Sequence, residues 1–555
     1  MSYKYGIDFG TTNSSIAIVK PDDTQRLRPS VLQVDPGNSW GPAELLRSIF
    51  YVDIEGGIHV GKDAEDTMAK EENAGQYDER RYKTQIKMDL ARANEIKISC
   101  ERFTYDATDL LAALFKRLKQ SADTFARNNR MEMVGAVLGV PVSFSEENKR
   151  IYLEALCKAG YYNSIQEAMS ITEFVSEPAA VAVNYGEKLT SNHRVMVFDY
   201  GGGTLDVCVV DLRNQIGRND RLHPHEVIAQ STGYDIGGER INKEFLLNFF
   251  VPKYGFENIK SYLGINSQSI TNGESLWNAM KQKYAGILFI QQIERCKQEL
   301  SSADSAFFVP PAELHTKGRN LRSITVTRED FQESVEGVFQ QVDIVVRDCI
   351  AQCRSHNPPV YPNQISGVFL AGGSSMIPYA KDILANYILD RSKIGVNTQR
   401  RALPSKEVTE SIVRGLAIVG YKEQILSDLL DCSYGTWDVR RNCFSEIIPK
   451  GTPISTIEND EFNDASGKCK DYEAADPNAK EMTIKIFQRT SGVNNDRDKE
   501  LKEITIPIGG RDGTDFKFYL SIDKKLKMLI LKVYSVSRKT FYIIPREDAR
   551  VSINL

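Results

Sequence analysis

Two similar stretches of the chain decide its fold, "IDFGTTNSSIAIV" (7–19) and "FDYGGGTLDVCVV" (198–210). Each contains an apolar strand with an acid near its end, a turn of small residues and a second apolar strand. The two stretches align without a gap, so that Asp8 corresponds to Asp199 and Gly10 corresponds to Gly201. Because one supersecondary unit occurs twice, we expect two similar halves that face a shared cleft.

A third junction, "GVFLAGGSSMIPYAKDIL" (367–384), has a strand, a double glycine and then a helix. Between the junctions, strand-like and helical segments alternate as far as residue 425. This alternation is typical of an α/β domain. The long helical patterns cover residues 106–126, 148–160, 275–301 and 328–353.

The last part of the chain has a different pattern. From residue 436 to residue 555, short apolar segments alternate with polar turns and no helical period is visible, which predicts an all-β domain. Within it, the polar segment 459–480 is expected to form a long exposed loop. The predicted organisation is an α/β domain at 1–425, a hydrophobic linker at 426–435 and a β-domain at 436–555.

The composition excludes several classes of partner. Charged residues make up 26% of the 555 residues and the formal net charge is −4, so the basic excess that is typical of nucleic-acid binding is missing. No segment approaches the ~18 to 20 apolar residues that span a bilayer, and the start of the chain does not resemble a secretory signal. The nine cysteines are scattered without a CxxC pair, which favours reduced thiols over a metal or disulfide framework. We therefore expect a cytoplasmic protein that binds neither nucleic acid nor membrane.

The small residues of the turns point to an anion. Without bulky side chains, the backbone N–H groups of such a turn can approach a phosphate closely. Asp8 and Asp199, at the strand ends, could share a Mg²⁺ ion through its waters, because Mg²⁺ dehydrates reluctantly. The alternative is a pair of ordinary glycine turns, each with an acid beside it, but that coincidence would have to occur twice. The residues expected to hold the two ends of a polyphosphate are Gly10, Thr11, Thr12, Gly201, Gly202, Gly203 and Thr204.

These motifs, with "VSEPAAVAVNYG" (175–186) and "FLAGGSSMIP" (369–378), resemble the phosphate, connecting and adenosine motifs of the 70-kilodalton heat-shock chaperones. That family belongs to the actin and sugar-kinase ATPase superfamily. The resemblance covers nearly the whole chain. It implies a two-lobed actin-like ATPase domain, an interdomain linker and a β-sandwich similar to the family's substrate-binding domain. It also implies ATP or ADP and Mg²⁺ as cofactors.

The resemblance assigns a role to each matching residue. Lys83 in "RYKTQIKMD" (81–89) matches the family's catalytic lysine, and Glu177 matches an acid that orders the water shell of the metal. Asp8 and Asp199 would face the metal. Because no residue resembles a strong base, we expect hydrolysis to be slow. The first phosphate loop would contain Thr11, Thr12 and Asn13, and the second would contain Asp199, Gly201, Gly202, Gly203, Thr204 and Asp206. The family's double glycine would be Gly237 and Gly238. The helix that contacts the ribose and base would contribute Glu294, Lys297 and Ser301, and the adenosine turn would contain Gly372, Gly373 and Ser374.

The sequence departs from the family pattern in three places. Gln298 and Met376 occupy the positions of two arginines that sandwich adenine, which weakens the expected grip on the base. Arg440 and Arg441 occupy an apolar cleft loop of the β-domain. The sequence runs to Leu555, directly after a strand, and we therefore expect no counterpart of the family's helical lid.

Two functions of different kinds agree with these observations. The first is an ATP-dependent chaperone-like switch in which slow hydrolysis of Mg-ATP controls polypeptide binding, with a J-domain co-chaperone and a nucleotide exchange factor as further implied partners. The alternative is a nucleotide-gated scaffold that binds one dedicated protein partner. A small-molecule kinase is less compatible, since it needs neither linker nor β-domain. In the linker, Leu429 and Leu430 would dock on the ATPase domain in the ATP state, or simply finish the preceding helix.

Overall fold

The structure is a computed structural model. It describes residues 2–21, 27–38, 41–100, 103–141, 144–186, 193–212, 226–233, 235–265, 267–311, 321–398, 404–422, 430, 433–438, 443–449, 452, 456–457, 459, 462, 464–473, 479–489, 498–508, 514–523 and 528–551.

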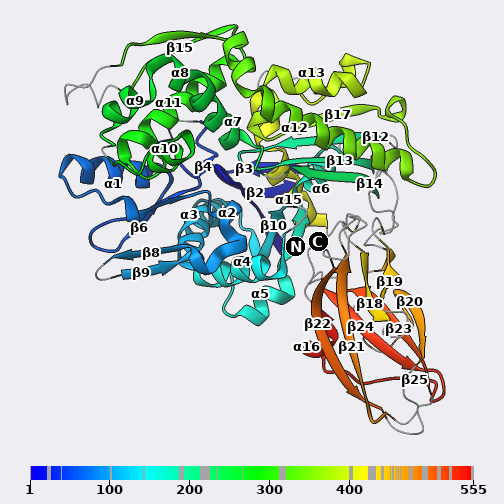
Figure 1. Ribbon diagram of the computed structural model, residues 1–555. Helices are drawn as coiled ribbons and strands as arrows, with labels where there is room; N and C mark the ends of the chain where they lie inside the picture. Colours follow the sequence, from blue (N-terminus) through cyan, green and yellow to red (C-terminus); the bar gives the residue numbers. More distant parts are fainter. Residues whose placement is uncertain are drawn as a thin grey trace.

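Two mixed β-sheets form the two lobes of the N-terminal part (Figure 1). The strands of the first sheet are β1 (Ser2–Phe9), β2 (Asn13–Pro21), β3 (Leu27–Val31), β4 (Leu46–Arg47), β10 (Glu132–Val140) and β11 (Glu173–Ser176). The strands of the second sheet are β12 (His193–Tyr200), β13 (Leu205–Leu212), β14 (Glu226–Gly233) and β17 (Gly367–Ala371). The strand orders are β11-β10-β1-β2-β3, with β4 beside β2, and β14-β13-β12-β17.

The two sheets repeat one arrangement. In each, a hairpin is antiparallel, β1 with β2 and β12 with β13. A strand from much later in the chain then lies parallel to the first strand of the hairpin, β10 beside β1 and β17 beside β12. The predicted repetition and the two-lobed α/β fold are therefore confirmed, and the two small-residue turns lie at equivalent ends of the two sheets.

Helices cover the sheets and agree closely with three of the four long helical patterns. They are α1 (Gly61–Asn73), α2 (Ile86–Asp89), α3 (Ala107–Asn128), α4 (Glu146–Lys158), α5 (Ile165–Ile171), α6 (Glu177–Gly186), α7 (Gly238–Phe245), α8 (Val251–Tyr254), α9 (Phe256–Leu263), α10 (Gly273–Met280), α11 (Tyr284–Leu300), α12 (Arg328–Ser355), α13 (Pro378–Tyr387), α14 (Pro404–Thr409) and α15 (Ser411–Lys422). The prediction of one helix over 275–301 is wrong. The chain breaks between α10 and α11, where Lys283 is extended and Gly286 lies so close to the backbone of Met280 that a Cβ would meet its carbonyl oxygen at 2.3 Å.

Helices α6 and α15 lie between the two sheets and form the floor of the cleft. A cluster of buried side chains joins them to both sheets, and it includes Val137 of the first sheet and Val197 of the second. Small residues make this close packing possible, since a Cβ on Gly415 would meet the carbonyl oxygen of Ala180 at 1.8 Å. The packing places the first residue of α6, Glu177, at the end of both sheets where the turns lie.

Three smaller sheets complete the N-terminal part. The first has the order β6-β5-β7 and the other two are the pairs β8-β9 and β15-β16. Their strands are β5 (Ile49–Val52), β6 (Ile58–Val60), β7 (Tyr82–Thr84), β8 (Lys97–Cys100), β9 (Phe103–Asp106), β15 (Ser305–Phe308) and β16 (Ile324–Thr327). In Figure 1, β6 and α1 lie on the same side of the molecule as α10 and α11.

The C-terminal part consists of two antiparallel sheets, with orders β19-β18-β21-β22 and β20-β23-β24-β25 and with β26 beside β24. Its elements are β18 (Ser433–Asp438), β19 (Cys443–Ile448), β20 (Lys468–Glu473), β21 (Glu481–Arg489), β22 (Asp498–Pro507), β23 (Asp515–Ile522), β24 (Leu529–Ser535), β25 (Thr540–Phe541), α16 (Arg546–Ala549) and β26 (Arg550–Val551). Apolar side chains from both sheets share one core, as expected for a sandwich.

Two details of this part differ from the sequence analysis. Strand β20 lies within the predicted loop 459–480 and pairs with β23 along its length. Its side chains are almost all exposed, and its sequence therefore shows no apolar period that would predict a strand. Leu430 is buried in the β-domain core, and its N–H donates to the carbonyl oxygen of Thr452 at 3.0 Å, so it does not extend the preceding helix; its docking on the lobes in the ATP state stays a prediction. Leu429, Arg440 and Arg441 lie outside the described residues.

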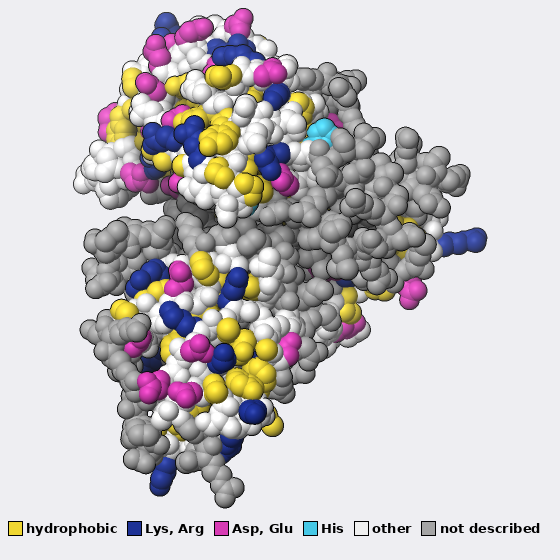
Figure 2. Space-filling model, turned by 90° about the vertical axis from the view of Figure 1, so that its right-hand side faces the viewer, with side chains coloured by type: hydrophobic (Ala, Val, Ile, Leu, Met, Phe, Trp, Pro, Cys, Tyr) yellow, Lys and Arg dark blue, Asp and Glu magenta, His cyan; other side chains and the backbone are white. Residues whose placement is uncertain are grey.

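The face of the molecule in Figure 2 shows no basic track in its described part. On the face in Figure 2, Lys and Arg side chains are intermixed with Asp and Glu side chains. Among the described residues, no helix is both long and apolar enough to cross a membrane.

Candidate functional site

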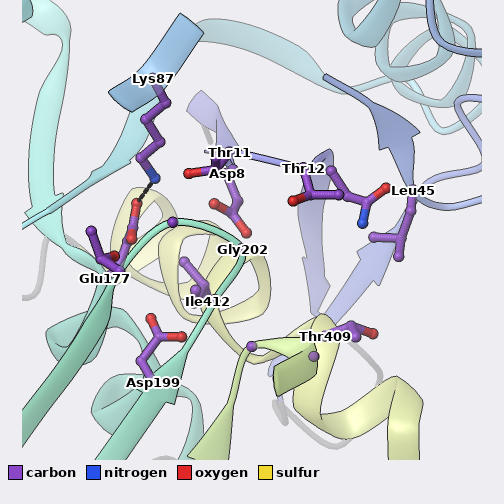
Figure 3. Close-up of a pocket in the computed structure, with 17 residues that line it drawn as sticks. Asp8, Thr11, Thr12, Leu45, Lys87, Glu177, Asp199, Gly202, Thr409 and Ile412 are labelled. Carbon is purple, nitrogen blue, oxygen red and sulfur yellow. Dashed lines mark hydrogen bonds and ion pairs between the residues drawn. The ribbon is translucent and has the colours of Figure 1, made fainter. Parts of the chain in front are cut away.

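A cavity of about 110 Å³ lies between the lobes, at the ends of the two hairpins (Figure 3). It is smaller than the roughly 300–1,000 Å³ pockets that bury whole drug-sized ligands, so it suits a phosphate group and ordered water. The lining residues are Asp8, Gly10, Thr11, Thr12, Asn13, Leu45, Lys87, Glu177, Asp199, Gly201, Gly202, Gly203, Thr204, Gly372, Gly373, Thr409 and Ile412.

The two turns have the same closing hydrogen bond and lie in contact with each other. The N–H of Gly10 donates to the carbonyl oxygen of Asn13 at 3.1 Å, and the N–H of Gly201 donates to that of Thr204 at 3.0 Å. A Cβ on Gly202 would lie 2.1 Å from the Thr12 hydroxyl oxygen. Glycine is therefore required where the second turn faces the first.

Carboxylates from both lobes point into the cavity. In Figure 3, Asp8 lies between the lobes, with Asp199 below it on β12. Burial, with repulsion from Glu177, raises the pKa of Asp8 to about 7, and the same two causes raise the pKa of Asp199 well above its usual value. Burial also raises the pKa of Asp206 to about 6, although a hydrogen bond from Thr232 acts in the opposite direction. The cavity therefore holds more carboxyl groups than its positive charge could balance if all of them were ionised.

One lysine partly balances this charge. Lys87 forms an ion pair with Glu177, drawn as the dashed line in Figure 3, and both side chains are 7% exposed. Burial acts to lower the pKa of Lys87, but the charges of Glu177 and Asp8 outweigh it and raise the pKa overall. Lys87 therefore stays charged in the cavity.

The lysine expected in the site was Lys83, and the structure does not bring it there. Lys83 lies on β7, paired with Phe50 of β5, and does not line the cavity. Lys87 is one helical turn further along the same segment, at the start of α2. Gln85 precedes that helix in a left-handed conformation, with φ of 59°, which turns the chain from the strand into the helix.

Most of the expected nucleoside residues surround the second turn without lining the cavity. The N–H groups of Gly237 and Gly238 donate to the carbonyl oxygens of Gly203 and Gly201, and the Ser374 hydroxyl donates to Gly201 as well. Gly372 has a φ of +70°, and a Cβ there would meet the Tyr200 carbonyl oxygen at 2.4 Å, so the third turn also needs glycine.

On α11, the expected ribose and base residues form one polar cluster. Glu294 accepts hydrogen bonds from Asn242, Lys297 and Gln298 at 2.6 to 3.0 Å. The Lys297 amine also donates to the Gly238 carbonyl oxygen at 3.2 Å, which joins the cluster to the second turn. Ser301 donates only to the α11 backbone in the described contacts, and Met376 packs at the margin of the core of the second lobe.

The arrangement fits a divalent cation held through water. Among the described residues, no three His, Cys, Asp or Glu side chains are placed to hold a metal directly. Oxygen donors at longer range suit Mg²⁺, which usually keeps several of its waters. The excess of carboxylates, with the raised pKa values of Asp8 and Asp199, shows that a cation would stabilise the ionised site.

Sequence reasoning missed four cavity residues. Lys87 lies within the quoted segment "RYKTQIKMD", four residues after Lys83. Which of the two lysines enters the cavity depends on the local backbone conformation, which the sequence does not reveal. Leu45, Thr409 and Ile412 gave no signal, because apolar and hydroxyl residues at such positions resemble ordinary packing residues.

A family model described as "Hsp70 protein" matches residues 4–496. The chain belongs to the Hsp70 family. Members of that family are ATPases that bind ATP or ADP with Mg²⁺ and act on polypeptide clients with co-chaperones.

Two curated relatives illustrate the distance within the family. The chain is 23% identical over 488 residues to the chaperone protein DnaK of Thermosipho africanus (strain TCF52B), which covers 88% of this chain and 70% of the relative. It is 22% identical, over the same length and shares, to the chaperone protein DnaK of Thermosipho melanesiensis (strain DSM 12029 / CIP 104789 / BI429).

Proposed function

We propose that this Hsp70-family chain binds and slowly hydrolyses Mg-ATP in the cavity between its lobes and thereby controls polypeptide binding by its C-terminal β-domain. The observation that carries the proposal is the meeting of two duplicated small-residue turns around one buried lysine and a cluster of carboxylates.

Different residues of the site have different roles in phosphoryl transfer to water. Mg²⁺, when bound, neutralises charge on the phosphate oxygens. The backbone N–H groups of the two turns hold the phosphates, and Asp8 and Asp199 hold the metal's waters. Lys87, rather than Lys83, supplies the positive charge at the transferred phosphoryl group. Hydrolysis is slow because none of the described residues that line the cavity is a dedicated strong base, and Glu177, Thr204 and Asp206 order water instead.

The nucleoside extends from the cavity toward the α11 cluster. Glu294, Lys297 and Ser301 face the ribose, and Gly372, Gly373 and Ser374 form the wall opposite. Gln298 and Met376 contact the base without a cationic stack. This placement is supported by the hydrogen bond from Lys297 to the double glycine beside the second turn.

A dedicated-partner scaffold is the second candidate, and one surface favours it. On the outer face of β23, β24 and β25, the Phe541 ring lies 5.6 Å from the Tyr519 ring and 5.0 Å from the Tyr534 ring, and nearby Ile543 is 90% exposed. An exposed apolar and aromatic surface of this kind is typical of a protein-interaction site, and it lies outside the nucleotide site.

Two measurements test the proposal. Calorimetry with Mg-ATP and Mg-ADP, followed by phosphate release, should show binding and slow turnover without a phosphorylated acceptor. A library of unfolded peptides should then bind with different affinity in ATP and in ADP. No nucleotide binding would overturn the proposal, and binding without any peptide response would favour the scaffold.

A further inference from the structure

One row of side chains crosses the second sheet at the end that faces the cavity. Asp199 on β12 lies directly opposite Asp206 on β13, and Asp206 lies directly opposite Thr232 on β14. Residues directly opposite each other in antiparallel strands have their side chains on the same face of the sheet. Because Asp199 lines the cavity, Asp206 and Thr232 belong to the face of the site, and Thr232 has no role in the function proposed so far.

Two hydroxyl groups hold the Asp206 carboxylate. The Thr232 hydroxyl donates to Oδ1 at 2.6 Å, and the Thr204 hydroxyl donates to Oδ2 at 3.2 Å. Asp206 is 1% exposed, whereas Thr204 lines the cavity. The Thr204 hydroxyl therefore connects the buried carboxylate to the phosphate site, and Thr232 holds the other oxygen of that carboxylate.

The neighbouring acid explains why Asp206 needs to be held. Like charges directly opposite each other destabilise a sheet, and Asp206 lies opposite Asp199. Strand β13 lies between β12 and β14, so Thr232 lies on the far side of Asp206 from Asp199. The hydrogen bond from Thr232 therefore directs one oxygen of Asp206 away from Asp199, which stays available to the waters of the metal.

The first hairpin has no equivalent series of contacts among the described residues. Ser15 lies opposite Asp8, in the place that Asp206 has in the second hairpin, and its buried hydroxyl has no hydrogen-bond partner among those residues. The repeated hairpin therefore does not explain the contacts of Thr232 and Thr204 with Asp206.

The strand itself does not require a hydroxyl at position 232. Valine is also β-branched and is equally suited to a strand. The preceding residue, Ser231, points to the opposite face, where its hydroxyl donates to Asp348 of α12 at 2.9 Å. The two adjacent hydroxyls of β14 thus have different partners, one in the row that reaches the site and one on a covering helix.

We propose that Thr232 is a positioning residue whose hydroxyl fixes the Asp206 carboxylate, so that the Thr204 hydroxyl donates to Asp206 and its oxygen accepts a hydrogen bond from the attacking water. The inference rests on the ATP hydrolysis proposed above. It assigns to Thr232 an effect on the chemical step, through Asp206 and Thr204, and none on the affinity for the nucleotide.

Single-turnover hydrolysis of Mg-ATP tests this assignment, with ATP affinity measured by calorimetry on the same samples. Thr232→Val keeps the shape of the side chain and removes the hydroxyl. Because a hydrogen bond to a charged group is lost, we expect the rate to fall about tenfold or more, with an affinity within about twofold of wild type. Thr232→Ser keeps a hydroxyl and should recover most of the rate.

Two controls separate positioning from a structural role. Ser231→Ala removes the adjacent hydroxyl on the opposite face and should keep the wild-type rate. In the Asp206→Ala background, Thr232→Val should cause no further loss of rate, because the carboxylate that Thr232 holds is absent.

A wild-type rate in Thr232→Val would overturn the inference, and so would an equal loss of rate in Ser231→Ala or in the Asp206→Ala background. A loss of affinity in proportion to the loss of rate would also overturn it, since that pattern belongs to a structural role. A wild-type chain that hydrolyses no ATP would overturn the proposed function itself, whereas an active wild type with an unaffected variant overturns the positioning role alone.

Discussion

The two hairpins of the lobes share a backbone and differ in their chemistry. Asp8 and Asp199 lie at equivalent strand ends, but Ser15 pairs with Asp8 across the first hairpin and Asp206 pairs with Asp199 across the second. The first turn presents the hydroxyls of Thr11 and Thr12. The second turn presents glycine backbone.

The difference in charge between the lobes is equally clear. Of the residues that line the cavity in the described part of the chain, Lys87 carries the one positive charge, and it comes from the first lobe. Each hairpin therefore supplies a similar end for one anion and a carboxylate at its strand end, Asp8 or Asp199, while the first lobe adds the cation of Lys87 and the second turn adds three successive glycines. Neither lobe alone contains a complete site.

Blocking the contact between the turns should have the largest effect. Gly202→Val places a side chain where the Thr12 hydroxyl lies, since even a Cβ would be 2.1 Å away. We expect Mg-ATP affinity to fall by at least ~10²-fold, measured by calorimetry, because the turns could no longer approach a shared phosphate. Gly337→Ala on α12 is the control, since a Cβ there meets nothing within 4 Å. Unchanged binding in the Gly202 variant would show that the turns do not act together.

The raised pKa of Asp8 should make metal binding depend on pH. Because Mg²⁺ needs ionised Asp8 and its pKa is about 7, we expect the apparent affinity for Mg-nucleotide to fall by up to about tenfold per unit below pH 7. Metal-free stability should change in the opposite direction. The folded-state pKa exceeds the usual 3.8, so the folded protein binds the proton more tightly and its unfolding free energy rises as pH falls from 7 toward 4.

Asp8→Asn should weaken both dependences, and the part that remains belongs to Asp199 and Asp206, whose pKa values are also raised. Calorimetry and thermal unfolding at pH 6, 7 and 8 measure them. If the aspartate and asparagine forms respond to pH in the same way, Asp8 is not the group that links protons to the metal.

Restoring cationic stacking in the second lobe should have a smaller effect. Arginine at Gln298 and at Met376 should each improve ATP affinity by about 1 kcal/mol, or roughly fivefold, through cation–π contact with the base. Because Gln298 donates to Glu294 at 3.0 Å, its replacement gives up one hydrogen bond and should gain less than the Met376 replacement. Calorimetry with ATP against GTP also reports base preference, and no gain at either position would place the base elsewhere.

The duplicated hairpins could be predicted from the sequence, whereas the choice between Lys83 and Lys87 could not. Two small-residue turns after apolar strands predicted the duplicated hairpins and the carboxylates at their ends, because strand period and turn chemistry are local properties. Lys83 and Lys87 differ by one helical turn. The left-handed Gln85 decides which of them faces the cavity, and no periodicity reveals it.

Tertiary contacts explain the remaining errors. The break between α10 and α11 follows from the close approach of Gly286 to Met280, which the continuous apolar pattern hides. Strand β20 has polar side chains on both faces, and only its pairing with β23 makes it a strand. Leu430 lies in the β-domain core, where its partners are distant in sequence, and its docking on the lobes in the ATP state stays a prediction.

The central claim is that a cation from the first lobe acts on a phosphate held between both turns. Single-turnover hydrolysis of Mg-ATP by Lys87→Ala and Lys83→Ala, with ATP affinity measured on the same samples, tests it most directly. The account predicts that Lys87→Ala lowers the rate by ~10²-fold or more with little loss of binding, since the charge acts mainly in the transition state, and that Lys83→Ala keeps the wild-type rate. Wild-type hydrolysis by Lys87→Ala would contradict it.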